Sequence, residues 1–274
     1  MTECGIFKEL SCSDYEAIPA IRQSHLKLMG ICPKAYKWSV DEMLADEPTA
    51  AMNFGTAVHW RVLQPERYLA QVAVKPDVDR RTKVGKAEYE EFLLANPGKV
   101  IITAEEAETC QAIARELETL TAAKKFLRPA EYELTLVWRD RETGIYCKAR
   151  LDCYQEHTGV VTDLKTTVSA LYHRFSKSIF DYGYHQQGAW YLSGLRRLGL
   201  PAKHFLLLAC EKEPPYLNAL YRLDDEVLEM ARLQNEANLK KVAACQATGQ
   251  WPGLDDYVQD ITLPEWTKKQ LGGI

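Results

Sequence analysis

Hydrophobic and polar positions recur with two different periods along this chain, and the change of period separates helical from extended parts. Apolar residues return at helical spacing over 53–70 and again over 103–125, where Thr103 and Glu106 form a capping-box pattern. The segment 71–100 lies between them without a clear period, and it predicts a loop-rich connection that includes the basic stretch KPDVDRRTKVGK. We expect that stretch to be a solvated loop or a mobile contact to an anionic partner.

The pattern then changes to alternation between residues 131 and 167. The segments YELTLVWRD, IYCKARLDCY and VVTDLKT alternate in polarity, and RETG and EHTG separate them as turns, which predicts a meander of three strands. A helix over about 177–198, two strands in KHFLLLACEK and YLNALYRL, and a long helix over 224–249 follow. This order predicts an α/β (α+β) fold with a central mixed β-sheet flanked by helices.

Composition and charge narrow the function classes. With 34 Lys and Arg against 38 Asp and Glu, the net charge is −4, which argues against non-specific coating of nucleic acid but permits a local basic groove. No apolar run approaches the length of a membrane span, and the N-terminus lacks a secretory pattern. The cysteines are scattered without zinc-type spacing and indicate reduced thiols, so we expect a cytoplasmic protein.

The strand VVTDLKTT carries the most informative polar residues. Asp163 and Lys165 are two apart and therefore share a strand face, and Asp152 stands near the end of the neighbouring antiparallel strand. Glu133 opens the first strand of the meander. Converging carboxylates repel unless a cation sits among them, and oxygen ligands suit Mg²⁺ or Mn²⁺. A lysine there can orient a water or stabilise charge on a phosphate, although Asp-x-Lys alone is common on solvated strand faces.

Asp152 followed by Asp163-Leu164-Lys165 resembles the signature of the PD-(D/E)xK nuclease superfamily. The likeness is closest to its RecB-like branch, and within it to the RecE-type exonucleases and their phage relatives. The segments GTAVH, ELTLVW, TGIYCKARLD and YGYHQQGAWY occur in the order expected for that branch. Leu151 stands where the superfamily name has Pro, and the second acid is Asp rather than Glu, which is within the pattern.

The resemblance implies a single restriction-endonuclease-like domain over residues 1–274. Its helical N-terminal part would span about 1–125, the catalytic sheet and helices about 126–250, and a tail that packs on the body 251–274. The implied catalytic residues are Asp152, Asp163, Lys165 and Glu133, with Glu131 as a competitor for the role of Glu133.

The implied metal ligands are His59, Asp152, Asp163 and the Leu164 carbonyl, with Mg²⁺ or else Mn²⁺ as the cation. The cysteine spacing does not support the iron–sulfur cluster that some relatives carry. The implied phosphate or DNA contacts are Gln187, Tyr191, Thr166 and Lys148. Each of these also has an ordinary alternative: His59 and the Gln187–Tyr191 pair as packing residues, Thr166 as a β-former, and Lys148 on a solvated face beside Arg150.

The function that the resemblance implies is a Mg²⁺-dependent exodeoxyribonuclease that degrades linear duplex DNA 5′ to 3′ and leaves 3′ single strands for recombination. It further implies a homo-oligomeric ring, a trimer or tetramer, and a RecT-type annealing protein as partner. Two alternatives stay open: an inactive module that binds DNA ends, and a single-strand or structure-specific nuclease on the same fold. A metal-dependent oxygenase is disfavoured because it leaves Lys165 and the Gln187–Tyr191 pair unexplained.

Overall fold

A computed structural model describes residues 2–42 and 49–262 of the chain. Its elements in chain order are β1 (Gly5–Phe7), α1 (Cys12–Ala17), α2 (Gln23–Leu26), the 3₁₀ helix η1 (Lys27–Gly30), α3 (Pro33–Glu42), α4 (Ala50–Leu63), α5 (Pro65–Gln71), β2 (Val72–Val74), α6 (Lys83–Ala95), β3 (Val100–Ile102), α7 (Ala104–Thr119), α8 (Thr121–Leu127), β4 (Glu131–Arg139), β5 (Tyr146–Gln155), β6 (Val160–Thr167), α9 (Tyr172–Asp181), α10 (Tyr184–Arg197), β7 (His204–Glu211), β8 (Asn218–Arg222) and α11 (Asp225–Thr248).

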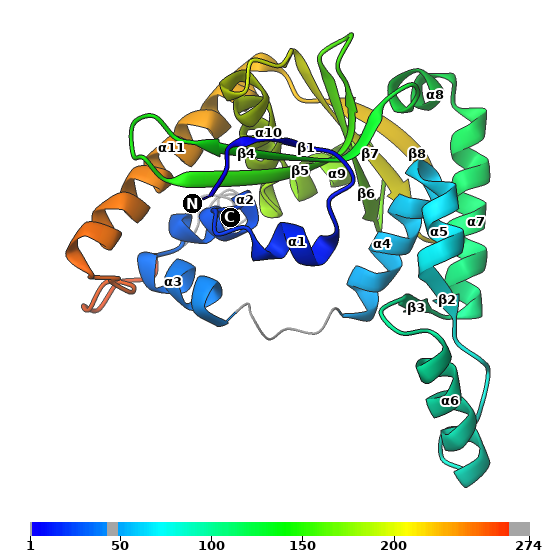
Figure 1. The fold of residues 1–274 in the computed structure, drawn as a ribbon. Helices are drawn as coiled ribbons and strands as arrows, with labels where there is room; N and C mark the ends of the chain where they lie inside the picture. Colours follow the sequence, from blue (N-terminus) through cyan, green and yellow to red (C-terminus); the bar gives the residue numbers. More distant parts are fainter. Residues whose placement is uncertain (1, 43–48, 263–274) are drawn as a thin grey trace, which may run out of the picture.

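A mixed sheet of six strands forms the centre, in the order β1-β4-β5-β6-β7-β8 (Figure 1). The pairs β4–β5 and β5–β6 are antiparallel and give the predicted meander, whereas β6 and β7 run parallel. A parallel pair needs a crossover connection, and α9 with α10 supplies it. The predicted mixed sheet flanked by helices is therefore confirmed.

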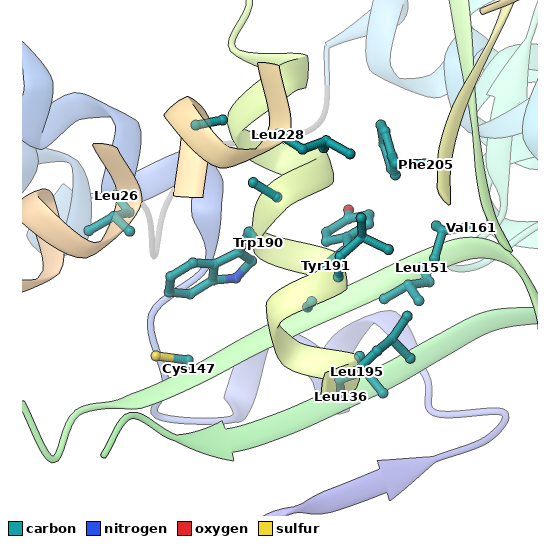
Figure 2. Packing of buried hydrophobic residues seen from close by; sticks show 14 of the residues in the cluster. Leu26, Leu136, Cys147, Leu151, Val161, Trp190, Tyr191, Leu195, Phe205 and Leu228 are labelled. Carbon is teal, nitrogen blue, oxygen red and sulfur yellow. The ribbon is translucent and has the colours of Figure 1, made fainter. Parts of the chain in front are cut away.

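Helices cover the sheet on both faces and enclose two hydrophobic clusters. The cluster on the α10 side joins α10 and α11 to strand residues such as Leu136, Leu151 and Val161 (Figure 2). The cluster on the α4 side joins α4, α7 and α8 to Cys153, Leu164 and others. We call these the α10-side and α4-side clusters. Burying both faces explains why β7, HFLLLACE, reads as a nearly continuous apolar run.

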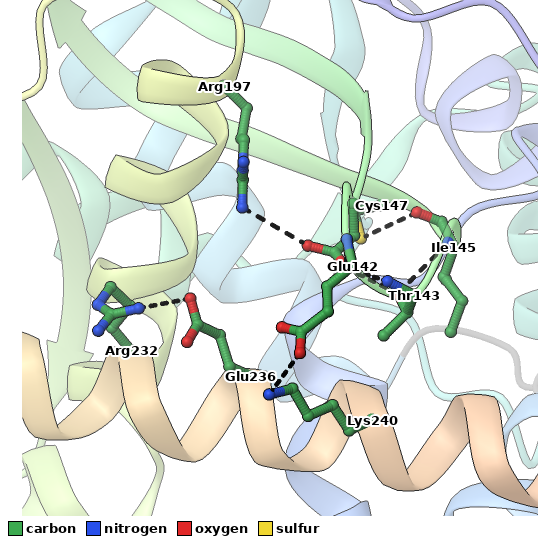
Figure 3. Close-up of polar contacts among 9 residues, drawn as sticks. Glu142, Thr143, Ile145, Cys147, Arg197, Arg232, Glu236 and Lys240 are labelled. Atoms are coloured by element: carbon green, nitrogen blue, oxygen red, sulfur yellow. Dashed lines mark hydrogen bonds and ion pairs between the residues drawn. The ribbon is translucent and has the colours of Figure 1, made fainter.

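Ion pairs connect the turn between β4 and β5 to α11 and α10 (Figure 3). Lys240 of α11 lies 2.7 Å from Glu142 in the turn, and Arg197 of α10 lies 3.8 Å from Asp140. Within α11, Arg232 pairs with Glu236. The turn lies at the opposite end of β4 and β5 from the polar residues Glu133 and Asp152. These contacts therefore stabilise the fold and are not part of the site.

Three predicted helices are broken in the structure. Gly183, with φ +74°, ends α9 and starts α10 within the predicted helix 177–198, because a left-handed residue interrupts the helical path. Leu120 is extended and separates α7 from α8 within the predicted helix 103–125. Pro65 begins α5 inside the predicted helix 53–70, since proline suits the first helical position.

The segment 71–100 is more ordered than the sequence predicts. It contains α6, which projects from the body below the short parallel strands β2 and β3 (Figure 1). Of the tail predicted to pack on the body, Trp251 does so by stacking on Tyr36 at 5.7 Å between ring centroids, whereas residues 252–262 are exposed. Residues 263–274 lie outside the described part. Over the described residues, no helix is both long and apolar enough to cross a membrane.

Candidate active site

Strand register brings three carboxylates to one level of the sheet. Tyr132 pairs with Cys153 and Leu134 with Leu151, so Glu133 stands opposite Asp152. The β5–β6 pairing ends at Cys153 and Thr162, and the next residues of the two strands are Asp152 and Asp163. The acids predicted from the sequence therefore converge because of register, as the meander prediction requires.

The sheet is irregular at this level. Glu133 has φ +53°, an unusual conformation for a residue with a side chain, and such strain is typical of functional sites. Leu134 belongs to the α10-side cluster but Tyr132 packs against the α4-side cluster, although alternate residues of a regular strand share a face. β4 thus switches faces at Glu133, and the carboxylate stands at the junction between the two cores.

Histidine 59 on α4 completes a compact group with two of these acids. One ligand atom from each of His59, Glu133 and Asp152 lies within 4.8 Å of the others. His59 Nε2 is 2.8 Å from the Leu164 carbonyl, which can only accept, so Nε2 carries the proton and donates. His59 Nδ1, which lies 3.4 Å from Asp152 Oδ2, is then unprotonated, and its lone pair can bind a metal ion.

Asp152 also connects β5 to β6 where the backbone pairing of these two strands ends. The Leu164 N–H donates to Asp152 Oδ2 at 3.0 Å, so the side chain replaces the strand partner that the backbone lacks there. The two main-chain groups of Leu164 are thereby tied to Asp152 and His59. The carbonyl predicted as a metal ligand lies at the site, bonded to His59.

Asp163 and Lys165 form a buried ion pair beside this group. Lys165 Nζ lies 2.5 Å from Asp163 Oδ1, and the aspartate side chain is fully buried. From the described residues no donor reaches Asp163 Oδ2, which leaves a buried carboxylate oxygen unsatisfied. Lys165 Nζ also stands 4.8 Å from the centre of the Tyr184 ring.

The titration of the site residues follows from burial and mutual repulsion. Burial, with the charge of Asp163, raises the pKa of Asp152 to about 7. Burial and Asp152 raise the pKa of Glu133, and burial with Lys165 lowers that of His59. Burial opposes the charge on Lys165, but Asp163 and Asp152 outweigh it and raise the pKa of Lys165. The site therefore gathers more negative charge than the protein alone compensates.

The Gln187–Tyr191 pair on α10 lies within electrostatic range of Asp163 and Asp152. Gln187 Nε2 donates to Tyr191 Oη at 2.7 Å, as residues four apart on a helix can. Burial, followed by the charges of Asp163 and Asp152, raises the pKa of Tyr191 well above its usual value. Tyr191 is thus a neutral hydroxyl close to the acids, and Gln187 fixes its orientation.

Arg150, which the sequence placed with Lys148 on a face open to solvent or DNA, belongs to the site instead. Its Nε lies 3.0 Å from Glu133 Oε2, and its guanidinium stands 4.8 Å from the centre of the Tyr15 ring. Its only signal was its place two residues before Asp152 on the same strand. Glu131, the competitor for the supporting acid, is instead in an exposed ion pair with Lys8 at 2.7 Å, which leaves Glu133 as the acid in the site.

The prediction that Lys148 contacts a DNA phosphate is wrong. Lys148 is 3% exposed, and its Nζ donates to the carbonyls of Tyr15, Glu16 and Ile18 at 2.8, 3.2 and 3.1 Å. A cation at a helix C-terminus stabilises it, so Lys148 fastens the end of α1 and is not available to a DNA phosphate. Thr166 is half-buried beyond Lys165 near the end of β6, and its contact with phosphate stays a prediction.

The residues fit a divalent cation. Two carboxylates and a neutral imidazole within 4.8 Å are a donor set for Mg²⁺, Mn²⁺ or a similar ion, and the unsatisfied Asp163 Oδ2 lies beside them. The predicted ligand set changes in one respect. Glu133 joins His59 and Asp152 in the compact group, whereas Asp163 pairs with Lys165 next to it.

Comparisons with known proteins agree with this geometry. The model of a family described as a PDDEXK-like domain of unknown function (DUF3799) matches residues 23–259. No curated protein matches the chain. The crystal structure of a candidate exonuclease from Eubacterium rectale is similar with a TM-score of 0.62 at 16% identity, covering 98% of this chain and 100% of that one. That likeness shows a shared fold.

A phage-related exonuclease from Haemophilus somnus 129PT is similar over 71% of this chain and 95% of its own, with 9% identity and a TM-score of 0.33, which is too low to support an argument. The family match spans most of the chain and includes every residue of the site from His59 to Tyr191. The chain therefore belongs to the family of PDDEXK-like domains, and its mixed sheet flanked by helices is the fold of that family.

Proposed function

We propose that the protein is a divalent-metal-dependent deoxyribonuclease that degrades linear duplex DNA from its ends. The observation that carries this proposal is the convergence of Glu133, Asp152 and Asp163 on three neighbouring strands, with Lys165 paired to Asp163 at 2.5 Å. A merely structural cluster of three acids, two of them buried, would be costly, because Asp163 raises the pKa of Asp152 and Asp152 raises that of Glu133.

The reaction is hydrolysis of a phosphodiester bond. Water attacks phosphorus, the bond from phosphorus to the 3′ oxygen breaks, and the products are a 3′ hydroxyl and a 5′ phosphate. A divalent cation held by His59, Glu133 and Asp152 would lower the pKa of the attacking water and neutralise part of the charge on the phosphate.

The protein's own side chains orient the phosphate and stabilise the negative charge that develops on its oxygens. Lys165 presents a fixed positive charge to the phosphate as negative charge grows on its oxygens, and Asp163 holds that ammonium in place. Tyr191, oriented by Gln187, offers a hydroxyl near the same oxygens. Arg150 pairs with Glu133 at 3.0 Å and opposes part of the rise in the pKa of Glu133, which favours the ionised form that binds a metal.

The finer features rest on the sequence resemblance to RecE-type exonucleases. They are digestion from 5′ to 3′, Mg²⁺ as the working cation, a trimeric or tetrameric ring around duplex DNA, and a RecT-type annealing partner in recombination. A ring would also reconcile the net charge of −4 with DNA binding, since only an inner channel need be basic.

The choice of substrate separates this proposal from its rivals. Purified protein is incubated with Mg²⁺ and linear duplex, closed circular duplex or single-stranded DNA, and strands labelled at the 5′ or 3′ end report polarity. We expect linear duplex to be degraded, circles to survive, and a 5′ label to be released first. Preference for single strands or forks would favour a structure-specific nuclease, and binding of ends without cleavage would favour an inactive module.

A further inference from the structure

A second cleft, of about 350 Å³, lies on the outer side of the α4-side cluster, between α4, α7 and α8. Four basic side chains line it: Arg61 of α4, Arg115 of α7, Lys124 of α8 and Arg128 at the end of α8. Glu118 is the one acid in its lining, and Val62, Leu117 and Leu127 contribute apolar surface. The cleft thus combines positive walls with an apolar floor.

The amphipathic character of α7 and the break at Leu120 create this cleft. Cys110, Ile113 and Leu117 of α7 are buried in the α4-side cluster, which leaves Gln111, Arg115 and Glu118 on a neighbouring face of the helix at helical spacing. An unbroken helix over 103–125 would carry α8 straight on. The extended Leu120 turns α8 instead, so that Lys124 and Arg128, four apart, face Arg115.

The positive charge of this cleft is not compensated by the protein. Four cations against Glu118 leave three positive charges in a chain whose net charge is −4. In the described part of the chain, none of the four cations has an ion-pair partner within 4.0 Å, and Arg61 donates to the neutral amide of Gln111.

The other arginine-rich cleft, beside Trp138 and Trp190, has two acids in its lining, Asp140 and Glu236. These acids pair with Arg197 and Arg232 (Figure 3), so that less of its positive charge is left uncompensated. Unpaired cations around a concave apolar floor are the arrangement that binds anionic ligands with a ring or other apolar part.

We propose that the α4–α7–α8 cleft is a binding site for a nucleoside phosphate, either free or as one unit of a nucleic acid strand. The cations would contact the phosphate, and Val62, Leu117 and Leu127 would lie against the sugar and base. A volume of about 350 Å³ is at the lower end for small-molecule sites, so it suits one nucleotide rather than a longer stretch.

This site is separate from the active site. His59 and Arg61 are two residues apart on α4, a rotation of about 200° on a helix, so they project to different sides. His59 contacts the Leu164 carbonyl on the sheet, whereas Arg61 contacts Gln111 on α7. Binding here requires neither the metal nor cleavage, and the inference therefore stands or falls independently of the proposed nuclease activity.

Isothermal titration calorimetry in EDTA tests the proposal, with deoxyadenosine 5′-monophosphate, inorganic phosphate, deoxyadenosine and a short single-stranded oligonucleotide as probes. We expect the monophosphate to bind more tightly than phosphate or the nucleoside alone. Lys124→Glu and Arg115→Glu should each weaken binding about tenfold or more, because each replaces a charge-assisted contact by repulsion. Lys125→Glu, the same change on the same helix outside the cleft lining, should leave binding unchanged.

The oligonucleotide probe distinguishes a free nucleotide from a nucleic acid strand as the ligand, and the Lys165→Ala variant tests whether the ligand binds in the active site instead. Tighter binding of the oligonucleotide through the same residues identifies a strand as the ligand, and binding of the monophosphate alone identifies a free nucleotide. The proposal is overturned if the wild type does not bind the monophosphate, if Lys125→Glu weakens binding as much as Lys124→Glu, or if Lys165→Ala abolishes it, since the ligand would then occupy the active site. Thermal unfolding confirms that the surface variants are folded.

Discussion

Replacing Asp152 by Asn should stabilise the metal-free protein at alkaline pH while removing its response to metal. The pKa of Asp152 is raised from 3.8 to about 7 by burial and by Asp163. The folded state therefore binds a proton more tightly than the unfolded state. The free energy of unfolding contributed by this group falls as pH rises from about 4 to about 7 and stays low above that.

The size of the effect follows from the shift. About three pKa units at roughly 1.4 kcal/mol each set an upper value of about 4 kcal/mol, and we expect a gain of about 2–4 kcal/mol for Asp152→Asn at pH 8.5. An asparagine oxygen can still accept the hydrogen bond that Leu164 N–H donates to Asp152 at 3.0 Å, so the backbone contact is kept.

Urea denaturation in EDTA, repeated from pH 5 to 8.5, measures this difference. The gain at pH 5 should be well under half of its plateau value, which it reaches above about pH 7. Saturating Mn²⁺ should then stabilise the wild type, by about 2.7 kcal/mol at a hundred times its Kd, and not the variant. The exposed Asp77→Asn serves as the matched control and should change nothing. A gain that is absent at pH 8.5, or equal at all pH values, would refute the reasoning.

Four further predictions test other parts of the account. Lys148→Met should lower the free energy of unfolding by about 2–4 kcal/mol, measured in urea, since three carbonyls at the end of α1 lose their donor. Gly188→Ala should cost about 1–3 kcal/mol in the same assay, because the added methyl group would lie 2.5 Å from the Phe205 ring. Gln187→Ala should slow DNA hydrolysis about tenfold, the value of one lost hydrogen bond to Tyr191, without changing stability by more than about 1 kcal/mol. Light scattering on the purified protein should give the mass of a trimer or tetramer if the ring forms, and a monomer mass would contradict it.

Local pattern was sufficient to predict the meander and most of the site. Alternation fixed the strands around Asp152 and Asp163, and the register of a short antiparallel turn requires those carboxylates to meet. Asp163 and Lys165 share a face because they are two apart, and Gln187 and Tyr191 meet because they are four apart. Each of these statements depends on residues close together in sequence.

Contacts between distant segments could not be predicted in the same way. Lys148 alternates with apolar residues like a solvated side chain, and only the packing of α1 against β5 reveals three carbonyl acceptors for it. The left-handed backbone of Glu133 and its ion pair with Arg150 depend on two strands at once. The three-residue strand β1 is too short to show a period, although it covers the edge of β4.

The most direct test of the central claim is release of acid-soluble nucleotide from linear duplex DNA by the wild type and by Lys165→Ala, each with Mg²⁺ and with EDTA. Lys177→Ala, on an exposed pair with Asp181, is the matched control. The account predicts release by the wild type and the control only with Mg²⁺, and a loss of at least about a hundredfold in Lys165→Ala. Cleavage by Lys165→Ala at the wild-type rate, or an inert wild type in both Mg²⁺ and Mn²⁺, would contradict it.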